Sequence, residues 1–187
     1  MRCRTSGLIA AVLAMTPLGE QQAVRVADKL RGKDFDGIFA STMVRTQQTA
    51  APLAADLGEQ VTVLPGLREI EAGAFEGQPE AQAGTTYFSA PAQWLRGDRD
   101  ARIPGSIDGN EFEDRFGDAV QQIYDSGDRN PVAFAHGGSI MLWTMMNAQK
   151  PNQALLQNHP LPNTAVVVLH GSPSAGWTLV DWDGVPG

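Results

Sequence analysis

Apolar residues recur along this chain at two spacings, one typical of helices and the other of buried strands. Thr16 and Pro17 favour a helix start, because Thr caps free amides and Pro fits the first turn. Gly32 ends this first helical pattern. The apolar positions that set its spacing are Leu18, Val24, Ala27 and Leu30.

Short apolar runs at residues 36–41 and 61–64 predict two buried strands. Between these strands we expect a second helix, capped near Ser41 or Thr42, that carries Arg45 in its first turn. Because Pro cannot donate the hydrogen bond of the helix interior, we expect this helix to be kinked or restarted at Pro52.

The carboxyl-terminal half repeats the alternation. A helical stripe returns with Phe112, Phe116, Val120 and Ile123. The run "VAFA" before His136 predicts a strand, and "SIMLWTMM" after it predicts a helix. Two closing strands are predicted at residues 164–170 and 177–182.

Alternating strands and helices predict the α/β class, with three layers and a mostly parallel sheet covered on both faces. The 187 residues, 42% of them hydrophobic, suit a single domain over 1–187. From Gly77 to Gly109 the pattern is irregular and rich in Gly, Pro, Ala and Arg. We expect residues 78–109 to form a lid-like insertion over a site.

Charge and cysteine content narrow the class of partner. The formal net charge of −7, with no basic run to offset it, argues against a nucleic-acid or membrane partner. A local pocket in an acidic protein can still bind an anion. The single Cys3 excludes an intrachain disulfide, and we predict a cytoplasmic location. The alternative is export, since the opening "MRCRTSGLIAAVLAM" resembles a clipped secretory signal.

His136 is the first candidate for chemistry. It lies where a strand is followed by a helix, at the edge of α/β sheets that holds ligands. Gly137 and Gly138 permit close approach of the backbone, and amides at a helix start point toward anions. A histidine that only satisfies its hydrogen bonds at a strand end fits this decapeptide equally well.

Arg45 and Glu69 follow the other two strands in the same way. The planar guanidinium of Arg45 can hold two oxygens of a phosphate or carboxylate. Glu69, beside Arg68, can protonate a leaving oxygen if its surroundings raise its pKa. Taken singly, a solvated helix arginine and an acidic loop residue are the simpler interpretations. Together with His136 they predict one pocket with a phosphate clamp, a proton donor and an imidazole.

Six segments in this order make the chain similar to the histidine phosphatases, also called phosphoglycerate mutase-like proteins. They are "TPLGEQQA", "STMVRTQQTA", "LREIEAGAFEG", "PGSIDGNEFEDRF", "AHGGSI" and "LPNTAVVVLH". The resemblance implies a nucleophilic histidine, in an Arg-His-Gly motif after the first strand, that carries the phosphoryl group as phosphohistidine. By position, it assigns phosphate binding to Arg45 and His136, and Gly137 at the helix start is a further candidate for phosphate binding. The resemblance makes His136 a catalytic stabiliser of charge and Glu69 the catalytic acid.

The chain departs from this family at the nucleophile. Arg-His-Gly occurs nowhere, and the other histidines, His159 and His170, lie far downstream. Aligning Arg2-Cys3-Arg4 with the motif places a bulky side chain where the backbone has to approach phosphate. We therefore expect the first strand of the family to be missing or replaced, and no nucleophile is found.

Three explanations stay open. The start of an active enzyme can lie upstream, which is the explanation we prefer because Arg45, Glu69 and His136 are all present. The chain can instead be a pseudoenzyme that binds phosphate esters without turnover. In the third, residues 7–13, "GLIAAVL", take the place of the lost strand. We expect the chain as written to be impaired, and an in-frame Arg-His-Gly in the preceding codons would decide for the first explanation.

Other chemistries fit less well. "AHGGS" resembles the oxyanion loop of esterases, but no Gly-x-Ser-x-Gly elbow occurs. Three dispersed histidines lack the spacing of metal ligands, so we predict neither a metal nor a cofactor. The predicted partner is a small-molecule phosphate ester. The short, neutral-to-acidic segment over the site favours its hydrolysis, and transfer to a second phosphoester, as in a mutase, stays an alternative. Arg96, Arg99 and Arg102 are candidates for extra anionic contacts, and a homodimer through the closing strands stays open.

Overall fold

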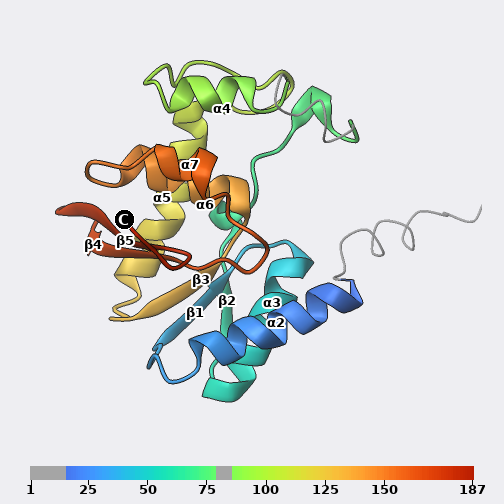
Figure 1. Ribbon diagram of the computed structural model, residues 1–187, viewed down its shortest axis with the longest axis vertical. Coiled ribbons are helices and arrows are strands. Elements are labelled where there is room, and N and C mark those ends of the chain that lie inside the picture. Colours follow the sequence, from blue (N-terminus) through green and yellow to red (C-terminus); the bar gives the residue numbers. More distant parts are fainter. Residues whose placement is uncertain (1–15, 79–85) are drawn as a thin grey trace, which may run out of the picture.

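The computed structural model describes residues 16–78 and 86–187, and Figure 1 shows their arrangement. Predictions that concern residues 1–15, including the leader-like opening and the replacement strand at 7–13, lie outside these described residues. The helices are α2 (Pro17–Leu30), α3 (Val44–Leu57), α4 (Ser89–Trp94), α5 (Gly109–Asp125), α6 (Gly137–Asn147) and α7 (Ala154–Asn158). The strands are β1 (Gly37–Ala40), β2 (Val61–Val63), β3 (Pro131–Phe134), β4 (Val167–Ser172), β5 (Gly176–Trp182) and β6 (Val185–Pro186). Short 3-10 turns are η1 (Pro65–Leu67) and η2 (Gly73–Phe75).

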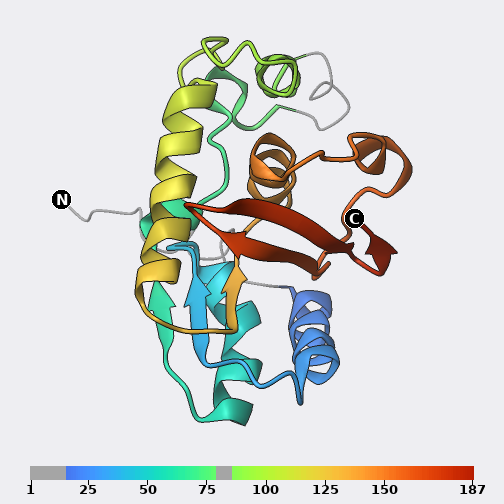
Figure 2. The same cartoon turned by 90° about the vertical axis from the view of Figure 1, so that its left-hand side faces the viewer.

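The first three strands form a parallel sheet in the order β2-β1-β3. Ile38 pairs with Val61 on one side and with Val132 on the other. Figure 2 shows this sheet between α5 on one side and the α2–α3 side of the molecule on the other. The arrangement confirms the α/β class predicted from the sequence.

Alternation along β1 explains the three layers. Ile38 and Ala40 point into a core shared with α2 and α3, whereas Phe39 points into the core on the α5 side. All three side chains are buried. A strand that is buried on both faces reads as a continuous apolar run, which is the pattern that predicted it.

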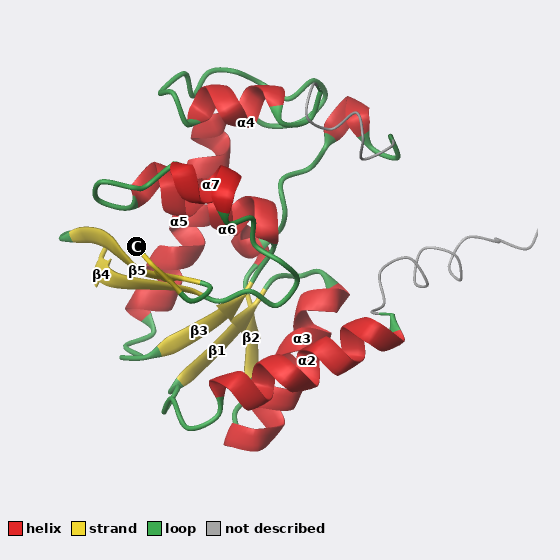
Figure 3. Ribbon diagram, viewed as in Figure 1, coloured by secondary structure: helices red, strands yellow, loops and turns green. Residues whose placement is uncertain are grey.

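The closing strands form a second sheet, antiparallel, in the order β4-β5-β6. Val167 pairs with Trp182, and the register shifts between Val168 and Leu169. Figure 3 shows this hairpin as a separate element beside the parallel sheet. Its inner side packs on α6 and α7 through a cluster with Met145, Leu155, Leu179 and Trp182. The two strands were predicted correctly, but they pair with each other and not within the parallel sheet.

Helix α2 begins as predicted, since the Thr16 hydroxyl accepts a hydrogen bond from the Gly19 N–H at 3.2 Å. Its apolar stripe was only half right. Leu18 and Val24 are exposed, and the buried positions are Ala23, Val26, Ala27 and Leu30. Small side chains are buried because α2 packs closely against α3, side by side in Figure 1.

Helix α3 corrects two expectations. It begins at Val44, after Met43, so neither Ser41 nor Thr42 caps it with a side chain. It also continues through Pro52 to Leu57, so the predicted restart is wrong, whereas the alternative of a kink stays a prediction. The buried neighbours Ala50, Leu53 and Ala54 hold both sides of the proline in the core, which offsets the lost backbone hydrogen bond.

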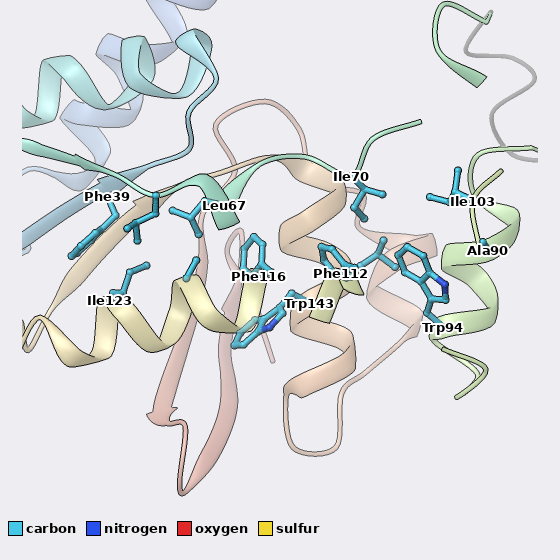
Figure 4. Close-up of a cluster of buried hydrophobic side chains, with 13 residues drawn as sticks. Phe39, Leu67, Ile70, Ala90, Trp94, Ile103, Phe112, Phe116, Ile123 and Trp143 are labelled. Carbon is cyan, nitrogen blue, oxygen red and sulfur yellow. The ribbon is translucent and has the colours of Figure 1, made fainter. Parts of the chain in front are cut away.

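The described part of the predicted insertion packs on the amino-terminal half of α5. Trp94 is 1% exposed and stacks on Phe112, with ring centroids 5.7 Å apart. Both belong to the hydrophobic cluster drawn in Figure 4, together with Ala90 and Ile103. The Trp94 indole N–H donates to the carbonyl of Ala101 at 2.7 Å. This segment therefore extends the main hydrophobic core, and its predicted role as a lid stays a prediction.

Among residues 16–78 and 86–187, no helix combines the length and the apolar character needed to cross a membrane.

Candidate anion-binding active site

The register of the parallel sheet brings two polar residues together at its carboxyl edge. Ala40, the last residue of β1, pairs with Phe134, the last residue of β3. Ser41 and His136 follow directly, and both are buried. The Ser41 Oγ lies 2.9 Å from the His136 Nε2, so the two strands are joined by their side chains just beyond the last backbone pair.

Arg45 reaches the same imidazole from the first turn of α3. Its Nη2 lies 2.9 Å from the Nδ1 of His136. A guanidinium only donates hydrogen bonds, so Nδ1 is the acceptor and the neutral ring carries its proton on Nε2. That N–H then donates to the Ser41 hydroxyl. Among the described residues no carboxylate forms an ion pair with Arg45, whose charge therefore faces the site.

A directed chain of hydrogen bonds supports this tautomer. The Ser41 Oγ accepts from His136 and from the Met43 N–H at 3.1 Å, which leaves its own proton for the Thr46 Oγ1 at 2.8 Å. Thr46 in turn donates to the carbonyl of Met43 at 2.8 Å. Each hydroxyl in the chain thus has both a donor and an acceptor partner. Because Ser41 and Thr46 are buried, the chain holds the imidazole in one orientation.

The surroundings of His136 keep it neutral. Burial, and to a smaller extent the nearby positive charges of Arg45 and Arg115, together lower the pKa of His136 to about 4. A neutral imidazole with Nε2 protonated offers one donor and one acceptor. At pH 7 the positive charge near the imidazole therefore comes from Arg45 and Arg115 and not from His136.

Glu69 lies against the start of α6. Its carboxylate accepts from the N–H groups of Gly138 at 3.0 Å, Ser139 at 2.8 Å and Ile70 at 3.0 Å. A Cβ on Gly138 would lie 2.9 Å from the Glu69 Oε1, so a larger residue at this position would make the carboxylate shift. The carboxylate thereby occupies two of the amides that we expected to face an anion.

Gly137 retains a free amide. Its N–H makes no hydrogen bond with any residue in the described part of the chain, and the residue is exposed. It directly follows His136, so its amide opens α6 beside the imidazole. Of the three N–H groups at the start of α6, those of Gly138 and Ser139 donate to Glu69. The Gly137 N–H, which we predicted to bind phosphate, is left available among the described residues.

Arg115, which the sequence analysis did not single out, holds the loop that carries Glu69. Its guanidinium donates to the carbonyl oxygens of Arg68 at 3.1 Å and Glu69 at 3.4 Å. Burial lowers the pKa of Arg115. The sequence held one sign of this role: Arg115 lies between Phe112 and Phe116 on the predicted apolar stripe. A charged side chain so close to core positions needs a hydrogen-bond partner.

One cavity of about 1500 Å³ is lined by Arg45, Glu69, His136 and Gly137 together. The structure thus brings together all the residues that the sequence predicted for the site, while their chemical roles stay predictions. No described residue of the segment 86–109 lines this cavity.

Two of the three arginines proposed for extra anionic contacts have other partners. Arg99 pairs with Glu113, and Arg102 pairs with Asp108 and Glu111. In residues 16–78 and 86–187 no three His, Cys, Asp or Glu side chains are grouped so that they could hold a metal ion.

Known proteins are similar to this chain in sequence. The sequence profile of the histidine phosphatase superfamily (branch 1) matches residues 13–184. PE_PGRS11, a PE-PGRS family protein of Mycobacterium tuberculosis, is 46% identical over 188 residues, which cover 92% of this chain and 32% of that protein. A probable phosphoglycerate mutase GpmB of Salmonella choleraesuis is 30% identical over 125 residues, or 66% of this chain and 58% of that one.

Solved structures with a similar fold include phosphatases. A mycobacterial glucosyl-3-phosphoglycerate phosphatase superposes with a TM-score of 0.73 and 25% identity, covering 90% of this chain and 86% of that one. The chain spans about a third of PE_PGRS11 and less than two thirds of GpmB, the two curated relatives named above.

Proposed function

We propose that this chain, which belongs to the histidine phosphatase superfamily (branch 1), binds small phosphate monoesters at the Arg45–His136 site and hydrolyses them poorly. The observation that carries the proposal is the 2.9 Å contact between the Arg45 guanidinium and the His136 imidazole. Beside it, the Glu69 carboxylate accepts from the N–H groups of Gly138 and Ser139, two and three residues after His136. A guanidinium, an imidazole N–H and a free amide suit the oxygens of a phosphoryl group.

Each group has a definite part in binding. The Arg45 guanidinium retains further N–H donors for two phosphate oxygens after one of them has bonded to the imidazole. The Gly137 N–H supplies a neutral donor at the start of α6. For His136 to donate to phosphate, its Nε2–H has to exchange Ser41 for a phosphate oxygen, or its Nδ1 has to take up a second proton and exchange Arg45 for a phosphate oxygen. A bound dianion favours that proton, because it offsets the positive charges that now lower the pKa of His136.

Glu69 is the proposed acid. In the structure its carboxylate is an acceptor for three N–H groups, whereas a proton donor needs a protonated oxygen. Substrate oxygens bound at the free Gly137 N–H would compete with Glu69 for the neighbouring Gly138 amide and repel the ionised carboxylate. We propose that substrate binding thereby favours the protonated acid, which then gives its proton to the leaving oxygen.

The missing group is a nucleophile. In this family the resemblance implies a histidine that attacks phosphorus, and no Arg-His-Gly occurs in the 187 residues. We propose that the chain as written turns over phosphate esters slowly or not at all. A phosphate-binding pseudoenzyme is the alternative, and a mutase-type phosphotransferase is a second one, for which the match to GpmB is the specific observation. A cytoplasmic location and a homodimer stay proposals.

Binding is tested by thermal unfolding of the 187-residue chain with increasing inorganic phosphate and orthovanadate. We expect a concentration-dependent rise in Tm that Arg45→Gln abolishes. Arg25→Gln, which removes an exposed arginine of α2, is the matched control and should keep the rise. If the rise survives in Arg45→Gln, the proposed site is wrong.

Turnover is tested separately with p-nitrophenyl phosphate. We expect little or no hydrolysis, and no phosphoenzyme after denaturing a reaction with radiolabelled phosphate ester. Robust hydrolysis that His136→Ala abolishes would show that the chain is not impaired. Phosphate binding without a phosphoenzyme would favour the pseudoenzyme.

A further inference from the structure

The loop that carries Glu69 takes its hydrogen-bond donors from outside the loop. Residues 68–72 join η1 to η2 and belong to no helix or strand. The backbone carbonyls of residues 68–71 therefore lack the neighbours of a regular element, and no backbone N–H in residues 16–78 or 86–187 donates to them. Because backbone carbonyls inside a protein need donors, other groups have to hold this loop.

Arg115 holds the first two of these carbonyls. Its guanidinium donates to the carbonyl of Arg68 at 3.1 Å and to that of Glu69 at 3.4 Å. The planar fork of a guanidinium can serve two neighbouring acceptors at once. The Arg115 Cζ also lies 5.8 Å from the centroid of the Phe112 ring, one turn earlier on α5, so the guanidinium is placed by packing as well.

Two side chains of the predicted insertion hold the next two carbonyls. The Tyr87 hydroxyl donates to the carbonyl of Ile70 at 3.1 Å, and the Ser106 Oγ donates to that of Glu71 at 2.7 Å. Burial, and next the negative charge of Glu69, raise the pKa of Tyr87, so its hydroxyl keeps the proton that it donates. Four consecutive carbonyls are thus held by three side chains from other parts of the chain.

Apolar contacts place the same loop against α5. Leu67 and Ile70, on either side of Glu69, are 1% and 3% exposed and belong to the cluster drawn in Figure 4. A Cβ on Gly66 would overlap the backbone carbonyl of Arg115, so the loop and the helix are in close contact. The two apolar side chains fix the ends of this stretch, and the donated hydrogen bonds fix the backbone between them.

Arg115 also brings a charge close to the acid. Burial lowers the pKa of Arg115, and its Nε is buried without a hydrogen-bond partner among the described residues. Such loss of hydration makes the charge costly. The negative charges of Glu71 and Glu69 oppose this shift of the pKa, so they attract the guanidinium. Arg115 therefore acts on Glu69 twice, through its backbone carbonyl and through its charge.

We propose that Arg115 is a positioning residue for Glu69, supported by Tyr87 and Ser106. These three side chains form a brace that holds the loop on α5 while the carboxylate reaches two amides of α6. A general acid needs its oxygen within hydrogen-bond distance of the leaving oxygen, so the position of the loop decides whether Glu69 can serve. The role of Glu69 as the acid rests on the proposed function, whereas the hold on its backbone does not.

The amides of Gly138 and Ser139 report where the Glu69 carboxylate lies. Both open α6 and have no carbonyl partner within the helix, so the carboxylate protects them from exchange with water. The readouts are their exchange rates and ¹H shifts, by NMR of the 187-residue chain, with Glu69→Ala as the reference for a lost carboxylate. We expect Arg115→Met to raise exchange at both amides about fivefold and to move both shifts toward this reference. Unchanged amides in Arg115→Met would overturn the proposal.

Two further variants separate positioning from charge and from a general loss of stability. Arg115→Lys keeps the charge but has one ammonium in place of the fork, so it should restore at most about half of the change. Full restoration would overturn the fork as the cause. Arg99→Met removes another arginine that reaches α5, through Glu113, and should leave both amides within about twofold of the wild type. An equal effect of Arg99→Met would show a general loosening of α5 and would also overturn the proposal.

A double variant shows whether Arg115 acts through Glu69. In Glu69→Ala, adding Arg115→Met should change exchange at the two α6 amides less than about twofold, because the group that it positions is gone. The same rise in both backgrounds would overturn the proposal. Tyr87→Phe removes one hydroxyl and keeps the ring, so it tests the brace even where Arg115→Met does not fold. We expect about a twofold rise at both amides, and no rise would count against the brace.

None of these readings uses phosphate or turnover. If the brace variants leave the two amides unchanged while Arg45→Gln abolishes the rise in Tm with phosphate, the positioning role is wrong and the proposed function stands. If the amides respond and the rise in Tm survives in Arg45→Gln, the proposed site is wrong and the hold on the Glu69 loop stands.

Discussion

The neutral state of His136 makes the stability of this protein depend on pH in a defined way. The imidazole has an ordinary pKa of 6.5, and burial beside Arg45 and Arg115 lowers its pKa to about 4. Between these values the unfolded chain takes up a proton that the folded protein excludes. The contribution of His136 is thus fully present above pH 6.5 and is lost progressively as the pH falls toward 4.

The size of the effect follows from the two pKa values. At about 1.4 kcal/mol for each pH unit, a difference from 6.5 to about 4 corresponds to about 3 kcal/mol between pH 7 and pH 4. His136 is 6% exposed, so solvent screening reduces this number little. About half of the effect should be visible at pH 5.3.

Urea unfolding followed by tryptophan fluorescence, at several pH values from 4.5 to 7.5, measures this contribution. Carboxylates also titrate at the acid end, so the readout is the difference between the wild type and His136→Gln, which keeps a donor and an acceptor but does not titrate. Direct titration of the His136 ring protons by NMR needs no variant. We expect a midpoint well below 6 that rises when phosphate is added. A midpoint between 6 and 7, or the same pH dependence in both proteins, would refute the assignment of a buried, neutral imidazole.

Three substitutions test other parts of the structure. Ser41→Ala removes the acceptor of the buried Nε2–H, so we expect a loss of about 1–3 kcal/mol in the free energy of unfolding and a changed tautomer in the ring ¹⁵N shifts of His136. An unchanged tautomer would contradict the hydrogen-bond chain. Glu69→Gln keeps an acceptor oxygen but removes the negative charge at the start of α6, so it should cost about 0.5–1 kcal/mol and lessen the repulsion of phosphate. Tighter phosphate binding in this variant supports the competition for amides, and weaker binding contradicts it. Trp94→Ala should cost about 3–5 kcal/mol by urea unfolding, because the ring is fully buried against Phe112, whereas Phe88→Ala, at an exposed ring, should cost much less. If Trp94→Ala lost as little free energy of unfolding as Phe88→Ala, the insertion would not belong to the core.

Short-range patterns in the sequence were sufficient for the elements and for the choice of site residues. Thr16 and Pro17 marked the start of α2, and the apolar run before His136 marked β3 with its change to helix. Three polar residues that each follow a strand were enough to predict that Arg45, Glu69 and His136 line one cavity. This works because the carboxyl ends of parallel strands meet at one edge of a sheet, whatever the details of packing.

What no local pattern contained was the pairing between groups that are distant in the chain. Glu69 takes the amides of Gly138 and Ser139, some 70 residues away, and Ser41 selects the tautomer of His136 across 95 residues. Local patterns likewise did not predict that Leu18 is exposed or that β4 lies in a separate sheet. Helical spacing and strand alternation determine which side chains share a face, but the partner of that face depends on how whole elements pack. Only the tertiary structure therefore decided which amides of the described residues Glu69 occupies and which amide is left for an anion.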